Sequence, residues 1–245
     1  MASQQPNLKA VAPRGRLVDR VALITGASRG IGRAVALAFR QEGALLTLVS
    51  RSREGIARVA EEMAGSGAEP LVLARDLTDA AAIEEIRAAI LMRWGRLDIL
   101  VGNAAELGPL ARVAELPQGA WDRVVALNLT ANYRLIHAFD DLLRASDAGR
   151  AIFVTSAISR GKTLRGAYAA SKAGLAWLIA AYAAEVADSR LRVNLVDPGP
   201  TRTDMRARAV PGEDPAGLRP PEAVVEAFIR LAAADCTENG VTVLA

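Results

Sequence analysis

The chain has 245 residues, of which 51% are hydrophobic and 4% aromatic, so it can form one large α/β domain with a core of alanine and branched aliphatic side chains. Its net charge of +3 is spread along the chain, which argues against a nucleic-acid partner. The chain has one cysteine, so it cannot form an internal disulfide. With only one histidine besides, a metal site is not expected. No apolar run reaches the roughly 20 residues of a membrane span, so no membrane contact is expected. The polar segment 1–16 lacks the apolar stretch of a secretory signal. We therefore expect a flexible tail at 1–16 on a cytoplasmic protein.

Short apolar runs alternate with longer helical patterns from residue 17 onward. Strands are expected at 21–26, 44–50, 69–76, 97–105, 149–156, 191–199 and 240–245. Helices are expected at 30–43, 53–65, 78–95, 117–146, 164–189 and 220–234, with Thr78 or Asp79 capping the third. Seven strands alternating with helices predict a single α/β domain at 17–245, a doubly wound parallel sheet with helices on both faces. Such sheets bind ligands beyond the carboxyl ends of their strands, so functional residues are expected there.

A glycine-rich turn, TGASRGIG, follows the first predicted strand and opens the first helix. Its three glycines have the spacing GxxxGxG rather than GxGxxG. Glycines in such a turn let the backbone approach a pyrophosphate over the N-terminus of the next helix. A plain tight turn is the alternative, but the position after the first strand favours dinucleotide binding. The residues expected at this ligand are Gly26, Ser28, Arg29, Gly30, Ile31 and Gly32.

The end of the second predicted strand indicates which dinucleotide binds. An NAD site needs an acidic residue there, which accepts from the ribose hydroxyls, whereas this chain has SRSR at 50–53. An arginine would instead pair with the 2′-phosphate of NADP, and Arg29 adds positive charge nearby. We therefore predict NADP(H) over NAD(H), with Arg51 as the main contact. Solvated surface arginines are the alternative.

Asp76 ends the third predicted strand, in the stretch RDLTD. Its carboxylate is expected either to accept from the adenine amino group, with the backbone of Leu77 beside it, or to cap the following turn. The sequence favours neither role over the other.

The stretch GAYAASKAGL places a tyrosine and a lysine four residues apart on a predicted helix. Tyr168 and Lys172 belong to a set of only three tyrosines and three lysines in the chain. Positions i and i+4 share a helix face, so the two side chains should project together. A phenol, with a pKa of about 10, becomes a useful acid or base near neutral pH only where a group such as a close ammonium stabilises the phenolate. An ordinary surface pair is the alternative.

Further short motifs follow one another in a defined order. They are DL at Asp76–Leu77, GNAA at Gly102–Ala105, NLT at Asn128, TS at Thr155–Ser156, YAASK at Tyr168–Lys172 and DPGPTRT at Asp197–Thr203. Together with TGASRGIG, their order and spacing make the chain resemble the short-chain dehydrogenase/reductase family, of the single-domain Rossmann type. The resemblance covers the chain from about Leu17 to the last predicted strand.

The resemblance implies a role for each matching residue. Tyr168 would be the general acid in reduction and the base in oxidation, Lys172 would lower the pKa of Tyr168 and bind the nicotinamide ribose, and Ser156 would orient the substrate oxygen. Asn128 would kink its helix and hold a water that relays protons to Lys172. Further cofactor contacts are implied for Asn103 on the adenosine side, Ala104, Pro198, Gly199, Thr201, and Thr203 at the carboxamide.

The chain departs from the family pattern in two places. Gly102 and Ala105 stand where the pattern NNAG has Asn and Gly, and the methyl of Ala105 would narrow the site. Ser156 precedes Tyr168 by twelve positions, one fewer than expected, so Thr155 and Ser159 are alternatives to it.

The segment 203–220 is expected to form a substrate lid. Arg206 and Arg208 within it would either bind an acidic group on the substrate or remain solvated. The helices that carry Asn128 and Tyr168 are rich in small apolar residues, and family members commonly pair these helices, so a homotetramer or homodimer is expected.

The function predicted from these observations is NADPH-dependent reduction of a small carbonyl substrate, a ketone or 3-oxoacyl thioester, to an alcohol. An NAD-dependent alcohol dehydrogenase working in the oxidative direction is one alternative. A non-catalytic, cofactor-binding regulator is another.

Overall fold

A computed structural model describes residues 15–65, 67–157 and 163–245 of the chain. Within these ranges seven strands form one parallel sheet in the order β3-β2-β1-β4-β5-β6-β7, which confirms the predicted fold class. The strands are β1 (Val21–Thr25), β2 (Leu45–Ser50), β3 (Leu71–Ala74), β4 (Ile99–Gly102), β5 (Arg150–Val154), β6 (Arg192–Asp197) and β7 (Thr242–Leu244).

The strand order reverses at β1. The first three strands run outward from β1 to one edge of the sheet, and β4 then pairs with the opposite side of β1, from which the remaining strands run to the other edge. The loops that follow β1 and β4 therefore leave the sheet side by side and diverge. Such a switch point is where open α/β sheets bind their ligands.

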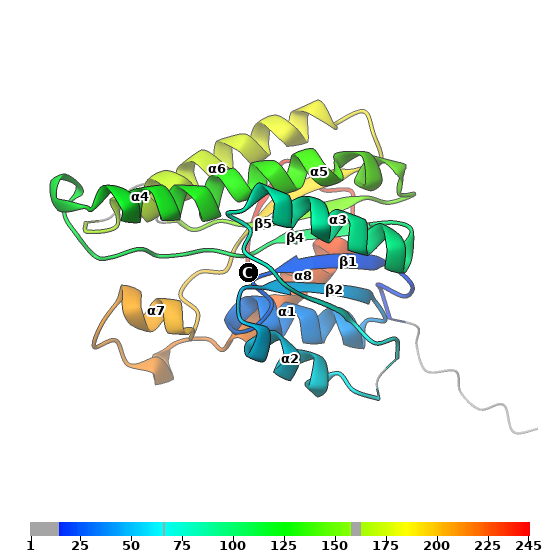
Figure 1. Ribbon diagram of the computed structural model, residues 1–245, viewed down its shortest axis with the longest axis horizontal. Coiled ribbons are helices and arrows are strands. Elements are labelled where there is room, and N and C mark those ends of the chain that lie inside the picture. The colour runs from blue at the N-terminus through cyan, green and yellow to red at the C-terminus, as the bar shows by residue number, and fades with distance from the viewer. Residues whose placement is uncertain (1–14, 66, 158–162) are drawn as a thin grey trace, which may run out of the picture.

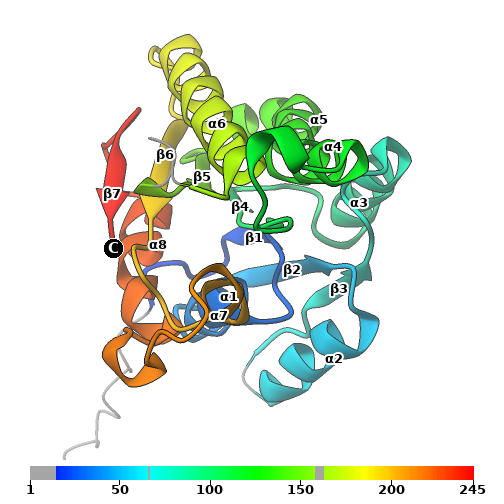
Figure 2. The same ribbon diagram turned by 90° about the vertical axis from the view of Figure 1, so that its left-hand side faces the viewer.

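The helices form one layer on each face of the sheet (Figures 1 and 2). On one face lie α1 (Gly30–Gln41), α2 (Arg53–Glu62) and α8 (Val225–Ala232). On the other lie α3 (Ala80–Trp94), α4 (Gln118–Val125), α5 (Ala131–Ala145) and α6 (Gly166–Glu185). The short helix α7 (Asp204–Ala209) belongs to neither layer and stands beyond the carboxyl ends of the strands, at the left of Figure 1.

Alternate side chains of each strand enter two separate cores. In β1, Ala22 and Ile24 pack in the cluster that contains α1 and α8, whereas Val21 and Leu23 pack with α3, α5 and α6. All four side chains are at most 1% exposed. A strand buried on both faces needs apolar residues at every position, which explains why the strands read as continuous apolar runs in the sequence.

Several predicted elements differ from the observed ones at their ends. The strand predicted at 97–105 ends at Gly102, because the chain leaves the sheet there to line the cleft described below. The helix predicted at 117–146 is divided by a π-helical turn at Ala126–Thr130. Asp79 rather than Thr78 caps α3, since its carboxylate accepts from the Ala81 N–H at 2.9 Å.

The predicted tail at 1–16 lies mostly outside the described residues, which begin at Gly15. Arg16 forms an ion pair with Glu226 at 2.7 Å, and Leu17 is fully buried. In the described part of the chain, no helix is both long and apolar enough to cross a membrane. The same ranges contain no group of three or more His, Cys, Asp or Glu side chains placed to hold a metal ion.

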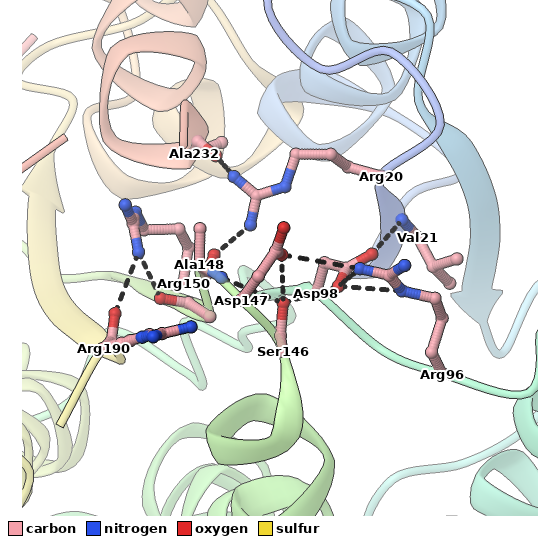
Figure 3. A network of polar contacts seen from close by, with 11 residues as sticks. Arg20, Val21, Arg96, Asp98, Ser146, Asp147, Ala148, Arg150, Arg190 and Ala232 are labelled. Atoms are coloured by element: carbon pink, nitrogen blue, oxygen red, sulfur yellow. Dashed lines mark hydrogen bonds and ion pairs between the residues drawn. The ribbon is translucent and has the colours of Figure 1, made fainter. Parts of the chain in front are cut away.

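A network of polar groups centred on the buried Asp98 joins the amino ends of the central strands (Figure 3). Asp98 is fully buried and accepts from the Val21 N–H at 2.9 Å, the Ser146 hydroxyl at 2.6 Å and the Arg96 guanidinium at 2.6 Å. Arg20 donates to two main-chain carbonyls in the same network. Because a buried charge without partners costs several kcal/mol, this network holds β1 and β4 in register.

Candidate active site

The turn between β1 and α1 forms a cradle in which three positions require glycine. Gly26 and Gly30 have φ angles of +66° and +53°, which L side chains rarely adopt. A Cβ on Gly32 would lie 2.3 Å from the Gly26 carbonyl oxygen, so a side chain there would displace the turn. Arg29, the N-cap of α1, places no side-chain hydrogen bond on the first turn of the helix. The turn therefore suits the pyrophosphate of a dinucleotide, whose charge the helix N-terminus attracts.

Asn103 braces this cradle from the end of β4. Its main-chain N–H donates to the Thr25 hydroxyl at 2.9 Å, and its side-chain amide donates to the Thr25 carbonyl at 2.9 Å. The Thr25 hydroxyl in turn donates to the Val101 carbonyl at 3.1 Å. Asn103 lines the cleft, as expected, but its amide is turned into the glycine turn and ties the two loops of the switch point together.

A cleft of about 750 Å³ opens at the carboxyl ends of the strands, a volume typical of ligand-binding sites. Most residues predicted for the site line it: Gly26, Ser28, Arg29, Gly30, Ile31, Gly32, Arg51, Leu77, Asn103, Ala104, Ser156, Tyr168, Lys172, Pro198, Gly199, Thr201 and Thr203. The predicted residues that do not line it are Asp76 and Asn128. Segments far apart in the sequence are thus brought to one edge of the sheet.

Arginines gather where β2 and β3 end. Arg51 lines the cleft as predicted, and so do Arg58 of α2 and Arg75 at the end of β3, which the sequence analysis did not identify. Arg75 occupies the same place after β3 as Arg51 after β2, so the same argument from strand ends would have found it. Arg58 gives no such signal, because only the packing of α2 determines which of its side chains face the cleft.

Asp76 caps a turn. One carboxylate oxygen accepts from both the N–H and the hydroxyl of Thr78, at 2.9 Å each. The other lies 3.9 Å from the Arg51 guanidinium, and both side chains are about half exposed. Of the two roles that the sequence left open for Asp76, these contacts favour the cap, and the carboxylate also partly balances the charge of Arg51.

Lys172 and Tyr168 lie together at the floor of the cleft. The Lys172 side chain is 1% exposed, and its ammonium donates to the Val154 carbonyl, at the end of β5, at 2.7 Å. The same nitrogen lies 5.9 Å from the centre of the Tyr168 ring. Ser156 is hydrogen-bonded to Tyr168. Of the alternatives to Ser156, Thr155 also lines the cleft, and Ser159 lies outside the described residues.

The protein environment favours the neutral forms of both catalytic candidates. Burial raises the pKa of Tyr168 to about 12, with a further contribution from the negative charge of Asp197, and the hydrogen bond with Ser156 opposes both. Burial also lowers the pKa of Lys172 to about 8. The net shift at Tyr168 is opposite to the lowered pKa that the family resemblance implies. The phenol is therefore a proton donor at neutral pH, and a stabilised phenolate needs positive charge beyond what the chain itself supplies.

Asn128 lies in the π-helical turn between α4 and α5 and is fully buried. Its side-chain oxygen accepts from the Glu106 N–H at 2.8 Å. Its side-chain nitrogen donates to the Glu106 carbonyl at 2.9 Å and to the Ser171 hydroxyl at 3.0 Å. This side chain therefore joins the loop after β4 to α6, directly beside Lys172 in sequence. A π turn inserted in a helix frequently marks a functional site.

Comparison with known proteins identifies the family. The sequence model described as short chain dehydrogenase matches residues 20–214. The chain belongs to the short-chain dehydrogenase family. As a member of this family it is an oxidoreductase that uses a nicotinamide dinucleotide, which agrees with the glycine cradle and the Tyr168–Lys172 pair.

Other short-chain dehydrogenases are similar over most of their length. The oxidoreductase YciK of Escherichia coli K12 is 36% identical over 219 residues, which are 88% of this chain and 86% of that protein. The 3-oxoacyl-acyl-carrier-protein reductase FabG of Salmonella typhimurium is 34% identical over 203 residues, 81% of this chain and 80% of the relative. A short chain dehydrogenase of Shigella flexneri, solved in complex with NADP, superposes with a TM-score of 0.90 at 35% identity, covering 94% of this chain and 98% of that one.

The lowered pKa of Lys172 predicts how stability depends on pH. Between about pH 8 and the ordinary lysine pKa of 10.5, the unfolded chain binds more protons at this position than the folded chain. The free energy of unfolding should therefore rise with pH across this window, by on the order of 2 kcal/mol between pH 8 and pH 10. Denaturant titration of the wild type and of Lys172→Met measures this effect. The free energy of unfolding of the wild type should rise relative to that of the variant as the pH increases from 8 to 10. A difference that stays constant across the window would contradict the lowered pKa.

Proposed function

We propose that the protein is an NADPH-dependent reductase of a small carbonyl compound, a ketone or 3-oxoacyl thioester, and that Tyr168 is its general acid. The observation that carries the proposal is the grouping of Tyr168, Ser156 and Lys172 at the floor of one cleft whose other end is the glycine cradle. A neutral phenol is the form required of an acid. Its raised pKa keeps Tyr168 in that form throughout the physiological range.

Each residue at the floor of the cleft would have a different role in the reduction. Bound NADPH would supply the hydride that the carbonyl carbon receives. Ser156 would donate a hydrogen bond to the carbonyl oxygen and hold it against the Tyr168 hydroxyl, which transfers its proton to that oxygen as negative charge develops. The Lys172 ammonium, together with the positive charge that the oxidised cofactor would carry, would stabilise the phenolate that remains until a proton from solvent restores it.

Replacing Tyr168 by Phe removes the proton donor and keeps the ring. Turnover of ketones with NADPH should fall by about 10²- to 10⁴-fold, the usual contribution of a general acid. The dissociation constant for NADPH, measured by fluorescence titration, should change little, because the cradle is untouched. A Tyr168→Phe enzyme that reduces ketones at the wild-type rate would contradict the role of Tyr168.

The preference for NADPH over NADH rests on the arginines at the ends of β2 and β3. Arg29, Arg51, Arg58 and Arg75 all line this part of the cleft. Arg75 is paired with Glu85 at 2.6 Å, and Arg29 with Asp204 at 3.4 Å. Within the described ranges the only ion pair of Arg51 is the long contact with Asp76, at 3.9 Å. Arg58 is exposed and forms none of the ion pairs of the described residues, but it lies within α2, whereas Arg51 directly follows β2, the strand end at which a 2′-phosphate is expected. We therefore assign the 2′-phosphate to Arg51. The NADP complex of the Shigella flexneri relative supports the same preference.

Substitution of Arg51 by Asp tests this preference. The change should weaken NADPH binding by about 10- to 100-fold, since it removes a charge-assisted hydrogen bond and adds a repulsive charge. NADH, which lacks the phosphate, should bind within about twofold of the wild-type affinity. Arg53→Asp is the matched control, because Arg53 is exposed and does not line the cleft. Equal losses for the two cofactors would remove the argument for NADPH.

We also propose that two or four copies assemble through α5 and α6. Tyr133 of α5 is 53% exposed and Trp177 of α6 is 79% exposed, so these helices present large aromatic side chains away from the sheet. The two helices are tied together by the Tyr182 hydroxyl, which donates to Asp140 at 2.8 Å. Light scattering should give a mass of at least two chains, and Trp177→Glu should reduce it. A wild type that is monomeric at every concentration would contradict this assembly.

A further inference from the structure

We propose that the carbonyl substrate carries an anionic group, a carboxylate or a phosphate, and that Arg165 binds this group beside Tyr168. The inference rests on the proposed function, since it concerns the substrate of the same cleft. It starts from the distribution of charge in the cleft and from one buried polar atom.

The lining of the cleft is strongly basic. Among the described residues it contains Lys172 and eight arginines but only one acidic side chain, Asp204, which is paired with Arg29. Four of the arginines lie with the glycine turn and the ends of β2 and β3, where the cofactor phosphates are expected. The other four, Arg165, Arg202, Arg206 and Arg208, come from the start of α6 and from the segment after β6. The phosphates of a bound dinucleotide would balance the charge of the first four arginines. They would not reach the other four, whose charge would be left without an anionic ligand.

Within the second group, Arg206 is already neutralised. Its guanidinium forms two hydrogen bonds with Glu213, at 2.6 Å and 2.5 Å, and of the two roles that the sequence left open for Arg206 this pairing argues against the binding of an acidic substrate group. Arg202 and Arg208 are exposed to solvent. An exposed arginine loses little by remaining hydrated, so neither of these two requires a bound anion.

Arg165 differs from the other three. It is partly buried, and one terminal nitrogen donates to the Ala209 carbonyl at the end of α7. Its Nε atom is buried and has no hydrogen-bond partner, and none of the ion pairs of the described residues includes Arg165. A guanidinium with an unsatisfied donor and no acidic partner is stabilised by an anion, so an anionic group that accepts from its N–H groups would be bound favourably.

The position of Arg165 limits where that anion would lie. Arg165 directly precedes α6, three residues before Tyr168, so the two residues occupy the same first turn. Its backbone is fixed by an isolated bridge to Ala111. The anionic group should therefore be only a few bonds from the carbonyl that Tyr168 protonates. Asp197, whose negative charge acts on Tyr168, does not line the cleft and accepts from the Gly199 N–H at 3.0 Å.

Matched pairs of ligands that share a ketone and differ in charge test the proposal. One series is 3-oxo acids of increasing length against their methyl esters, and a second pair is dihydroxyacetone phosphate against dihydroxyacetone. Binding is measured by calorimetry with the protein saturated in NADP⁺, because the oxidised cofactor cannot reduce a ketone. At least one charged ligand should bind about tenfold more tightly than its neutral partner, and the series in which this occurs distinguishes carboxylate from phosphate.

Variants at Arg165 assign this preference to its guanidinium. Arg165→Gln, which keeps a donor for the Ala209 carbonyl, should abolish the preference and leave the affinity for the neutral partner unchanged. Arg165→Lys should retain part of it. Arg112→Gln is the matched control, because Arg112 is 77% exposed, pairs with Glu115 and does not line the cleft.

The proposal is overturned if no charged ligand binds more tightly than its neutral partner, or if Arg165→Gln retains the preference. Turnover with NADPH separates this inference from the proposed function. Reduction of neutral ketones without any preference for charge would overturn only the role of Arg165. Charge-selective binding without reduction of any ligand by either cofactor would overturn only the proposed reductase activity.

Discussion

The hydrogen bond from the buried Lys172 ammonium to the Val154 carbonyl is the contact on which the site depends. It is 2.7 Å long and joins the middle of α6 to the carboxyl end of β5. Because Ser156 follows β5 by two residues and Tyr168 lies one turn before Lys172, this contact brings all three side chains together. The burial that makes the contact possible also lowers the pKa of the lysine and raises that of the tyrosine. The burial of Lys172 and Tyr168 thus determines both where their side chains lie and how readily they exchange protons.

The cofactor and the substrate are expected to bind in one cleft, at the carboxyl ends of the strands. The hydrogen bonds of Asn103 and Thr25 close the switch point, and glycine at three positions leaves room for a pyrophosphate above α1. Positive charge is then arranged on both sides of this cradle, at the ends of β2 and β3 and again around α6 and α7. A cleft whose described lining has nine cationic side chains and a single carboxylate selects anions at both ends.

The sequence predicted the fold well and the details of the site less completely. Strands buried on both faces give unbroken apolar runs, so all seven could be located. The small residues Ala104 and Ala105 beyond Asn103 extended the predicted strand, and the end of β4 was placed three residues too late. The π turn at Asn128 gives no periodicity of its own within a helical pattern. Motif order located Tyr168, Ser156 and Lys172. The direction of the pKa shift at Tyr168 depends on its burial and on the negative charge of Asp197. Both effects arise only when the chain is folded, so the sequence does not reveal them.

The most direct test is the ionisation of Tyr168 itself. The chain has only three tyrosines, so NMR spectra of protein labelled with ¹³C at the tyrosine Cζ contain three phenol signals, and Tyr168→Phe identifies the relevant one. In the protein alone this signal should remain that of a neutral phenol up to at least pH 10.5, in keeping with a pKa of about 12. Saturation with NADP⁺, which brings a positive charge to the floor of the cleft, should lower that pKa. A Tyr168 that ionises below pH 10 in the protein alone, or whose pKa NADP⁺ leaves unchanged, would contradict the account.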